Sequence, residues 1–490
     1  MNKTKEVLYQ TAAIRRRPTA APPAKRIPRG WSAVPIRTAE DPLELQWTSL
    51  HVPSERSKAS QPEWSSRFRI TIAVEIREEI RVEAYSLVTG TILGTFDIRY
   101  AYVFQPFEII LNEEQTRIVQ QEGAGLRIVS ETENPLWIFD DLSGDKDKAF
   151  FTPHMMQIAN HNRRMDLFLD RMLSLSSLQP FGWLEGCVLD GLYSLRDIVG
   201  KEQADKVIRM HLEQFILPNG QLHYEDLHGR PADGRFSGNE STLPMAVLAK
   251  LEPNHPLIDQ VISYWPSILN HDVITAESAY TVACPMAVIA SNQCNESLAR
   301  TAVQQILIRR DHLIDGGDLY GIVRAKEEQR TMRNWARSYT WYMLGMIRTW
   351  IELKRTEHFR RIPEMKEIEA AFKQIADIAL ARREPNGLWS CFLGEPETKI
   401  ETSGSAGIAA ALALGAKHGL LSQTAFSAAE EALHALQDYL TPDGILSGVC
   451  QHNCGGLQLQ RGGYRTMSQM GMGLMAQLYV AVHAADESEH

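Results

Sequence analysis

Two tryptophans flank an arginine near residue 337, in a segment whose side chains suit an acidic sugar. Trp335, Arg337 and Trp341 open an apolar stretch with helical spacing. An indole face stacks on the C–H surface of a pyranose ring, and a guanidinium holds a carboxylate through two charge-assisted hydrogen bonds. The structural alternative is an amphipathic helix whose core contains both indoles, with Arg337 reaching the surface.

Two glutamates, Glu240 and Glu277, are candidates for acid–base chemistry, and each lies in the first turn of an expected helix. Glycosidic hydrolysis generally requires one protonated carboxyl group and one ionised carboxylate. A helix N-terminus stabilises the ionised form, so position alone makes each glutamate a good base and a poor acid. One of the two must therefore have its pKa raised by desolvation or by the charge of the other. A purely structural role at the helix start is the alternative for each.

Further residues are candidates for substrate contacts, and each has a structural alternative in the core, in a helix cap or in a loop. Glu401, for example, has the sequence position of a capping acid. The segment from Cys450 to Cys454 also contains a histidine, but no second Cys or His pair follows at zinc-site spacing, so we predict a loop without a metal. The substrate-binding candidates besides the tryptophan–arginine segment are Trp183, His223, Tyr224, Glu401, His452 and Arg465.

From about residue 150 onward, helices alternate with turns that carry Asn, Asp or Gly. Such turns recur at residues 218–222, 315–320, 385–389 and 442–446. Apolar residues at helical spacing predict helices over residues 184–198, 243–251, 279–289, 341–351, 368–380 and 408–414. The unequal intervals between turns argue against a strict tandem array. Helical hairpins closed into a ring would bury every inner face.

The chain before residue 150 has a different character. Alternating or β-branched stretches predict strands at residues 68–76, 83–88, 91–100 and 107–111. We expect a small antiparallel, sandwich-like domain over residues 30–145 that packs on the helical domain or joins subunits of a homo-oligomer; a carbohydrate-binding module is the alternative. Residues 1–29 are basic and proline-rich and are predicted to form a mobile arm or an extended strap over the second domain, with an arm that binds nucleic acid as the alternative. Residues 150–485 are predicted to form the helical catalytic domain.

Composition limits the functional classes. The chain has 490 residues, 44% of them hydrophobic, and a net charge of −9, so it can bury a large core and repels nucleic acid. The sequence contains no run of about eighteen apolar residues, so we predict no membrane span. The basic start lacks the apolar stretch of a secretory signal, and six scattered cysteines suit reduced thiols. These features predict a cytoplasmic protein, and no sequence motif indicates a cofactor.

Residues 155–480 resemble the unsaturated glucuronyl and rhamnogalacturonyl hydrolases, glycoside hydrolase families 88 and 105. A Trp-x-Arg-x-x-x-Trp segment of those families matches Trp335, Arg337 and Trp341. Their Gly-Leu-Trp turn and Glu-Thr-Ser-Gly-x-Ala helix start match residues 387–389 and 401–406. The resemblance implies a mainly α protein with an (α/α)6 barrel, here preceded by the small β domain, and it implies a uronic acid as substrate.

The two catalytic aspartates of those families correspond to glutamates here. The resemblance places Glu277 of the segment 274–280 and Glu240 of the segment 240–244 at these positions. Both changes keep the acid and lengthen the side chain by a methylene group. By this match, Glu277 is the general acid and Glu240 its partner. The changes favour hydrolysis of a saturated glucuronide, as in the related β-glucuronidase family 154, over hydration of a C4–C5 double bond.

Other functional classes make different demands on the sequence. A non-catalytic carbohydrate-binding barrel would keep Trp335 and Arg337 but tolerate loss of either glutamate. A uronate lyase would require a histidine or tyrosine base, and a terpenoid-type barrel would require an aspartate-rich motif, which the sequence lacks. We therefore predict a glycosidase that removes a terminal uronic acid from oligosaccharides or glucuronides.

Overall fold

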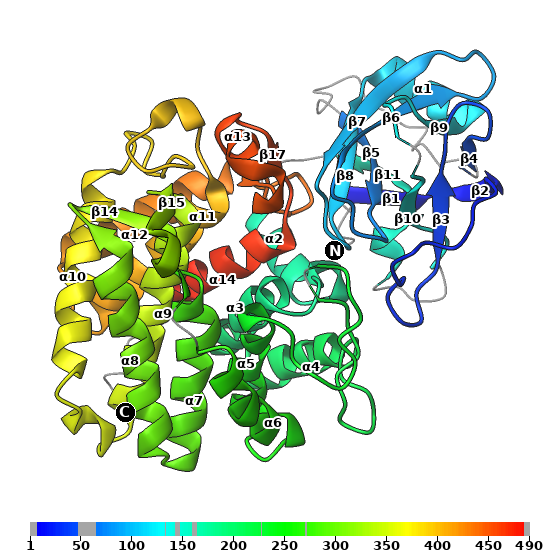
Figure 1. Cartoon of the computed structure of the whole chain (residues 1–490). Coiled ribbons are helices and arrows are strands. Elements are labelled where there is room, and N and C mark those ends of the chain that lie inside the picture. Colours follow the sequence, from blue (N-terminus) through cyan, green and yellow to red (C-terminus); the bar gives the residue numbers. More distant parts are fainter. Residues whose placement is uncertain are drawn as a thin grey trace.

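The structure, a computed structural model, describes residues 7–47, 65–132, 134–142, 148–158, 164–226, 228–269 and 272–484. A β domain formed by the first third of the chain lies beside a larger helical domain (Figure 1). No helix in these described ranges is long and apolar enough to cross a membrane.

Within the described ranges, six helices form a closed ring, because each contacts the next and the last contacts the first. In chain order they are α3 (Trp183–Val199), α5 (Pro244–Leu251), α7 (Cys284–Gln293), α9 (Ala336–Arg355), α11 (Thr402–Lys417) and α14 (Gln469–His483). Each ring helix packs against an outer helix: α4 (Lys201–Leu212), α6 (Pro256–Tyr264), α8 (Glu296–Leu313), α10 (Met365–Ala381), α12 (Gln423–Gln437) and α2 (Arg164–Met172). The predicted (α/α)6 barrel is confirmed, and each predicted helix overlaps a helix of the structure.

The ring closes between α3 and α14 because two glycines let their backbones meet. A Cβ atom on Gly191 would lie 2.6 Å from the carbonyl oxygen of Gly473, and one on Gly473 would lie 2.4 Å from the oxygen of Cys187. Real side chains do not tolerate such distances, so the absence of a side chain at both positions sets the spacing of these helices. The inner faces of the ring helices form the main hydrophobic core.

The β domain consists mainly of two antiparallel sheets packed around their own core. The first has the strand order β1 (Val7–Thr11), β11 (His154–Ile158), β5 (Ser65–Thr71), β8 (Pro106–Leu111); the second has the order β2 (Ala13–Arg16), β4 (Leu43–Gln46), β9 (Ala124–Ile128), β6 (Glu79–Ser86), β7 (Ile92–Arg99). A third, two-stranded sheet pairs β3 (Ala33–Ile36) with β10 (Leu136–Phe139), and α1 (Glu113–Glu122) follows β8. Exposed and buried side chains alternate along the first residues of β6, as expected for a sheet with one face in the core.

The first residues of the chain differ from the predicted arm. Residues 7–16 form β1 and β2, and Val7 and Ala12 are buried. The basic, proline-rich composition belongs mainly to the segment after residue 16, which hid the short strands before it. At the other end, β11 completes the first sheet beyond residue 145, while residues 1–6 and 143–147 lie outside the described ranges.

A buried ion pair joins the β domain to the barrel. The Nη1 and Nη2 atoms of Arg69 on β5 donate to the two carboxylate oxygens of Asp443, at 2.7 and 2.9 Å. Asp443 belongs to one of the predicted turns of the helical domain, and neither side chain is exposed to solvent. Glu108 on β8 accepts a second hydrogen bond from Arg69. This pairing fixes the β domain against one end of the barrel.

Candidate functional site

The two candidate acids lie on adjacent turns of the barrel. Glu240 belongs to the 3-10 turn Asn239–Thr242, which leads into α5, and Glu277 precedes the π-helical turn Ala279–Ala283, which leads into α7. The two turns contact each other. Glu240 and Glu277 are therefore presented by the starts of neighbouring ring helices.

Hydrogen bonds between the neighbours of these acids hold the turns together. The Nδ2 atom of Asn239 donates to Oγ of Ser278 at 2.6 Å, and Oγ1 of Thr242 donates to the carbonyl oxygen of Thr281 at 2.5 Å. Asn239 and Ser278 directly adjoin Glu240 and Glu277 in sequence. The prediction that both glutamates approach one site therefore has a geometric basis.

A small sheet positions the backbone that leads to Glu277. The strand β12 (Val273–Thr275) pairs with β14 (Asp318–Arg324), which pairs in turn with β15 (Gln329–Arg333). Beyond the strand, the amide of Ala276 donates to the carbonyl oxygen of Gly321 at 2.9 Å. The buried Arg309 of α8 donates to the carbonyl oxygen of Thr275 at 2.9 Å.

A glycine makes room for the other carboxylate. Gly238 has a φ of +73°, and a Cβ atom at this position would lie 2.2 Å from Oε2 of Glu240. The backbone conformation and the close approach both require the absence of a side chain. The Glu240 carboxyl group is thus held directly against the main chain of its own loop.

Burial raises the pKa of both acids, and electrostatic repulsion adds to the rise at Glu277. Burial raises the pKa of Glu277 well above its usual value, and the charge of Glu240 raises it further, against smaller opposing effects of Arg309 and Arg337. Burial also raises the pKa of Glu240. Within the described residues, Oε1 of Glu277 is buried and has no hydrogen-bond partner. Of the two acids, Glu277 therefore has the surroundings that favour the protonated form most strongly, which is the form a general acid needs.

Arg337 lies inside the site but differs from the predicted two-pronged clamp. Its side chain is buried, and Nη2 donates to the carbonyl oxygens of Cys450 and Gln451 at 2.9 and 2.7 Å. A carboxylate that pairs with an arginine through two parallel hydrogen bonds accepts either from Nε and Nη2 or from Nη1 and Nη2, so both arrangements need a free Nη2. The available part of Arg337 is its positive charge and its buried Nε, which has no partner among the described residues.

Aromatic side chains surround this arginine. The Arg337 guanidinium lies 4.9 Å from the ring centre of Trp335 and 5.9 Å from that of Trp183. Trp183 packs edge-on against Trp341 at 5.3 Å, and Trp341 stacks on Tyr280 at 6.1 Å. The structure brings these three tryptophans together, although each is at most 9% exposed.

The β domain contributes a residue that the sequence did not reveal. The ring of Tyr102 lies edge-on to that of Trp183, with 6.4 Å between the ring centres. The ring centres of Tyr102 and His452 are 4.6 Å apart. The charges of Arg337 and Glu277 both act on its hydroxyl group. No motif marks Tyr102, because it comes from another domain and reaches the site only through the domain contact.

Two histidines face the same region. Burial, followed by the charge of Arg337, lowers the pKa of His452 to about 3, so its imidazole is neutral. The charge of His228 acts on both His452 and Glu240. His452 was predicted to touch the substrate, whereas His228 was missed, because it lies in a loop without a recognisable pattern.

Two other predicted ligands have structural contacts instead. The Glu401 carboxylate caps α11, accepting from the amides of Ser403 and Gly404, and it also accepts from the amide of Cys450. Arg465 donates to the carbonyl oxygens of Ile400, Tyr464, Thr398 and Lys399. These contacts give the polar groups of both residues a structural role in holding the backbone, and their contact with substrate stays a prediction.

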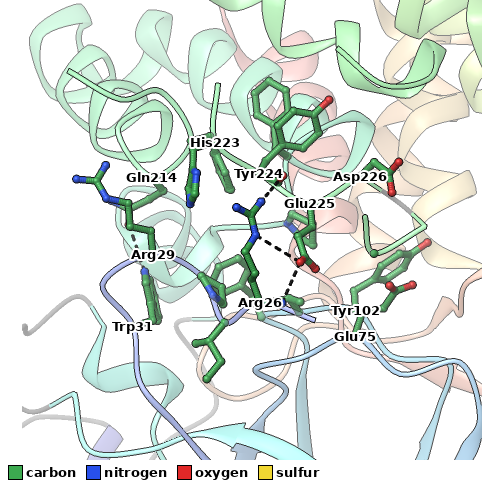
Figure 2. A pocket seen from close by; sticks show the side chains of 18 residues that line it. Arg26, Arg29, Trp31, Glu75, Tyr102, Gln214, His223, Tyr224, Glu225 and Asp226 are labelled. Carbon is green, nitrogen blue, oxygen red and sulfur yellow. Dashed lines mark hydrogen bonds and ion pairs between the residues drawn. The ribbon is translucent and has the colours of Figure 1, made fainter. Parts of the chain in front are cut away.

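His223 and Tyr224 line a separate pocket beside the acids. Nδ1 of His223 lies 3.0 Å from the Asp233 carboxylate, and Tyr224 is buried against Phe181 at 4.6 Å. Figure 2 shows both residues on the wall of this pocket, across from Tyr102.

The cysteine–histidine segment has contacts of its own. Nδ1 of His452 accepts from the amide of Cys454, and Sγ of Cys450 accepts from Arg337. No group of three or more metal-ligand side chains occurs in the described ranges. All six cysteines are free thiols, and Cys294 and Cys454 are the exposed ones.

Residues 280–484 match the model of a family described as Glycosyl Hydrolase Family 88. The matched region includes Trp335, Arg337 and Trp341 but begins just after Glu277, so it does not cover the two acids. The match supports an enzyme that acts on glycosidic bonds. No curated protein matches the chain.

Solved structures of the same group share the fold. A family 105 glycoside hydrolase from C. acetobutylicum is 17% identical with a TM-score of 0.56, covering 66% of this chain and 98% of its own. A possible family 105 member from Salmonella enterica is 16% identical with a TM-score of 0.53 and coverages of 62% and 83%. A family 88 glycosyl hydrolase from Bacteroides vulgatus is 16% identical with a TM-score of 0.50 and coverages of 66% and 98%. The predicted resemblance to families 88 and 105 is confirmed.

Proposed function

We propose that the protein is a glycoside hydrolase that removes a terminal uronic acid from an oligosaccharide or glucuronide, with Glu277 as general acid and Glu240 as its partner. The observation that carries the proposal is the pair of acids on hydrogen-bonded turns, of which Glu277 has a strongly raised pKa. In this proposal Glu277 protonates the leaving oxygen. Glu240, ionised, activates water or attacks the anomeric carbon.

The groups around the acids support an anionic pyranose as the substrate. Arg337 supplies a buried positive charge beside Trp183, and Arg309 supplies another behind Glu277. A uronate carboxylate would interact with the charge of Arg337 and its unpartnered Nε, while the sugar ring would lie against the aromatic walls. The proposal therefore requires one contact from the guanidinium rather than two.

Hydration of the double bond of an unsaturated uronide is the second candidate. The family 88 match over residues 280–484 favours it, because this region includes the tryptophan–arginine segment. The glutamates at the two acid positions favour the saturated substrate, since the longer side chains change the shape of the cavity.

Cytoplasmic location and self-association through the β domain remain predictions.

The proposal is tested by measuring hydrolysis rates on a saturated and a Δ4,5-unsaturated uronide with the same aglycone. Mass analysis of the products follows. We expect faster turnover of the saturated uronide and loss of that turnover in Glu277→Gln. Turnover of the unsaturated uronide alone would replace the reaction but keep the acids. Absence of turnover on both uronides would overturn the enzymatic function.

A further inference from the structure

A pocket with a cavity volume of about 80 Å³ lies where three parts of the chain meet. Its walls come from the N-terminal segment around Trp31, the β domain around Tyr102 and the barrel loop around Tyr224 (Figure 2). The apolar side chains that face it include Ile27, Trp31, Phe104, Phe181, Phe215 and Tyr224. Concave sites lined mainly by apolar and aromatic side chains are typical binding sites for small molecules.

The pocket adjoins the two acids. Tyr102 lines it and also lies within the electrostatic reach of Glu277. Phe181, on the opposite wall, precedes Gly182, whose Cβ position would lie 3.4 Å from the carbonyl oxygen of Glu240. A group leaving the sugar at the acid pair would therefore have this pocket beside it.

Apart from Arg29 and the Tyr224 hydroxyl, which is buried without a hydrogen-bond partner among the described residues, most polar side chains of the pocket are already paired with protein. Arg26 donates to the Asp233 carboxylate and to the carbonyl oxygen of Tyr224, and its amide donates to Glu225. The indole of Trp31 donates to Gln214. The remaining polar side chains follow the same rule: His223 pairs with Asp233, Glu75 with Lys25, and Asp226 with Arg230 and Ser237.

This pairing decides the chemistry of the occupant. A second sugar would need free donors and acceptors for its hydroxyl groups, and unpaired hydroxyls in a closed site cost binding free energy. An aromatic or other apolar ring needs only the aromatic walls. Arg29, an exposed residue of the lining, is left to contact a polar substituent of such a ring.

We propose that this pocket binds the aglycone of the substrate and that the aglycone is an apolar, ring-containing group rather than a further sugar. The inference rests on the proposed uronidase activity. It assigns the N-terminal segment a role in substrate choice, because Ile27 and Trp31 complete a site whose catalytic groups lie on the barrel.

The test compares methyl β-D-glucuronide with naphthylmethyl β-D-glucuronide, whose leaving groups are both alkoxides. Ile27→Asn alters a half-buried wall residue, and Ile14→Asn, also half-buried and N-terminal but packed on the β-domain core, is the matched control. We expect Ile27→Asn to lower kcat/KM for the naphthylmethyl substrate by roughly tenfold or more and to leave the methyl substrate unchanged. Ile14→Asn should leave kcat/KM unchanged for both substrates.

Titration with naphthylmethanol, followed by tryptophan fluorescence, gives a readout that does not depend on catalysis. Saturable binding to the wild type that Ile27→Asn weakens and Ile14→Asn preserves supports the pocket assignment. Equal loss on both glucuronides, or no binding of naphthylmethanol, would overturn it. If neither glucuronide is hydrolysed by the wild type, the proposed function fails, and the titration alone then shows whether the pocket takes apolar rings.

Discussion

Replacing Gly238 by alanine should inactivate the enzyme while leaving its fold nearly intact. The new Cβ atom would lie 2.2 Å from Oε2 of Glu240, about 1 Å closer than an ordinary contact. The atom in the way is the end of a flexible side chain, so Glu240 can rotate aside at little cost in stability. The carboxylate would then lie about 1 Å or more from its catalytic position.

The expected effects on stability and on rate differ in size. Alanine at a φ of +73° and a ψ of 166°, a backbone conformation almost confined to glycine, destabilises the fold by roughly 1–3 kcal/mol. A displacement of about 1 Å in a catalytic group lowers the rate by about a hundredfold. The loss of activity should therefore far exceed what the loss of stability explains.

Gly234 provides a matched control in the same loop. Its φ is +66°, and a Cβ atom there meets nothing within 4 Å. Gly234→Ala should also lower the melting temperature, because of its positive φ, but keep near wild-type kcat/KM. Thermal melting and kcat/KM on a chromogenic glucuronide, measured for the three proteins, separate strain from displacement. Equal activity of the two variants would refute the assignment of Glu240 as a catalytic group.

Three further substitutions test the site and the domain contact. Glu277→Gln should reduce kcat on an alkyl glucuronide by about 10²–10⁴-fold with unchanged melting, because the general acid is lost; a smaller loss would argue against that role. Arg309→Gln removes a positive charge that lowers the pKa of Glu277, so the alkaline limb of the kcat/KM profile should move to higher pH, whereas the same change at the neighbouring, half-buried Arg310, which pairs with Glu367, should not move it. Asp443→Asn removes one of the two carboxylates that pair with the buried Arg69 and should destabilise the protein by up to about 3–5 kcal/mol in thermal melting. Arg69 holds the pKa of Asp443 below its value in the unfolded chain. The stability that this ion pair adds is therefore fully present at pH values above the unfolded pKa, and it is lost as the pH falls from there toward the lower folded pKa.

The barrel was predictable because its information is local. Helical spacing of apolar residues and the recurring Asn, Asp and Gly turns each act within a few residues, and both agree with the structure. The strands β1 and β2 were missed, because they are short and become strands only by pairing with β11 and β4, far away in the chain. Pairing over such distances leaves little trace in a short sequence window.

The site was only partly predictable for a similar reason. The positions of Glu240 and Glu277 came from a family resemblance, while the bonds between Asn239 and Ser278 that bring their turns together depend on the folded ring. Glu401 has the same sequence signature whether its carboxylate binds a ligand or caps a helix. Only the amides that it contacts in the structure separate the two roles.

Because the ring closes through the contact between α3 and α14, the barrel cannot be completed until the last ring helix has been synthesised. The first ring helix, Trp183–Val199, cannot cover its apolar side until the last one, Gln469–His483, has been made. Until then a growing chain exposes hydrophobic surface along an open arc of helices, which is the condition under which nascent proteins aggregate. We expect shortened chains that lack α14 to need chaperones or to precipitate, even though every residue named at the acid pair is present in them.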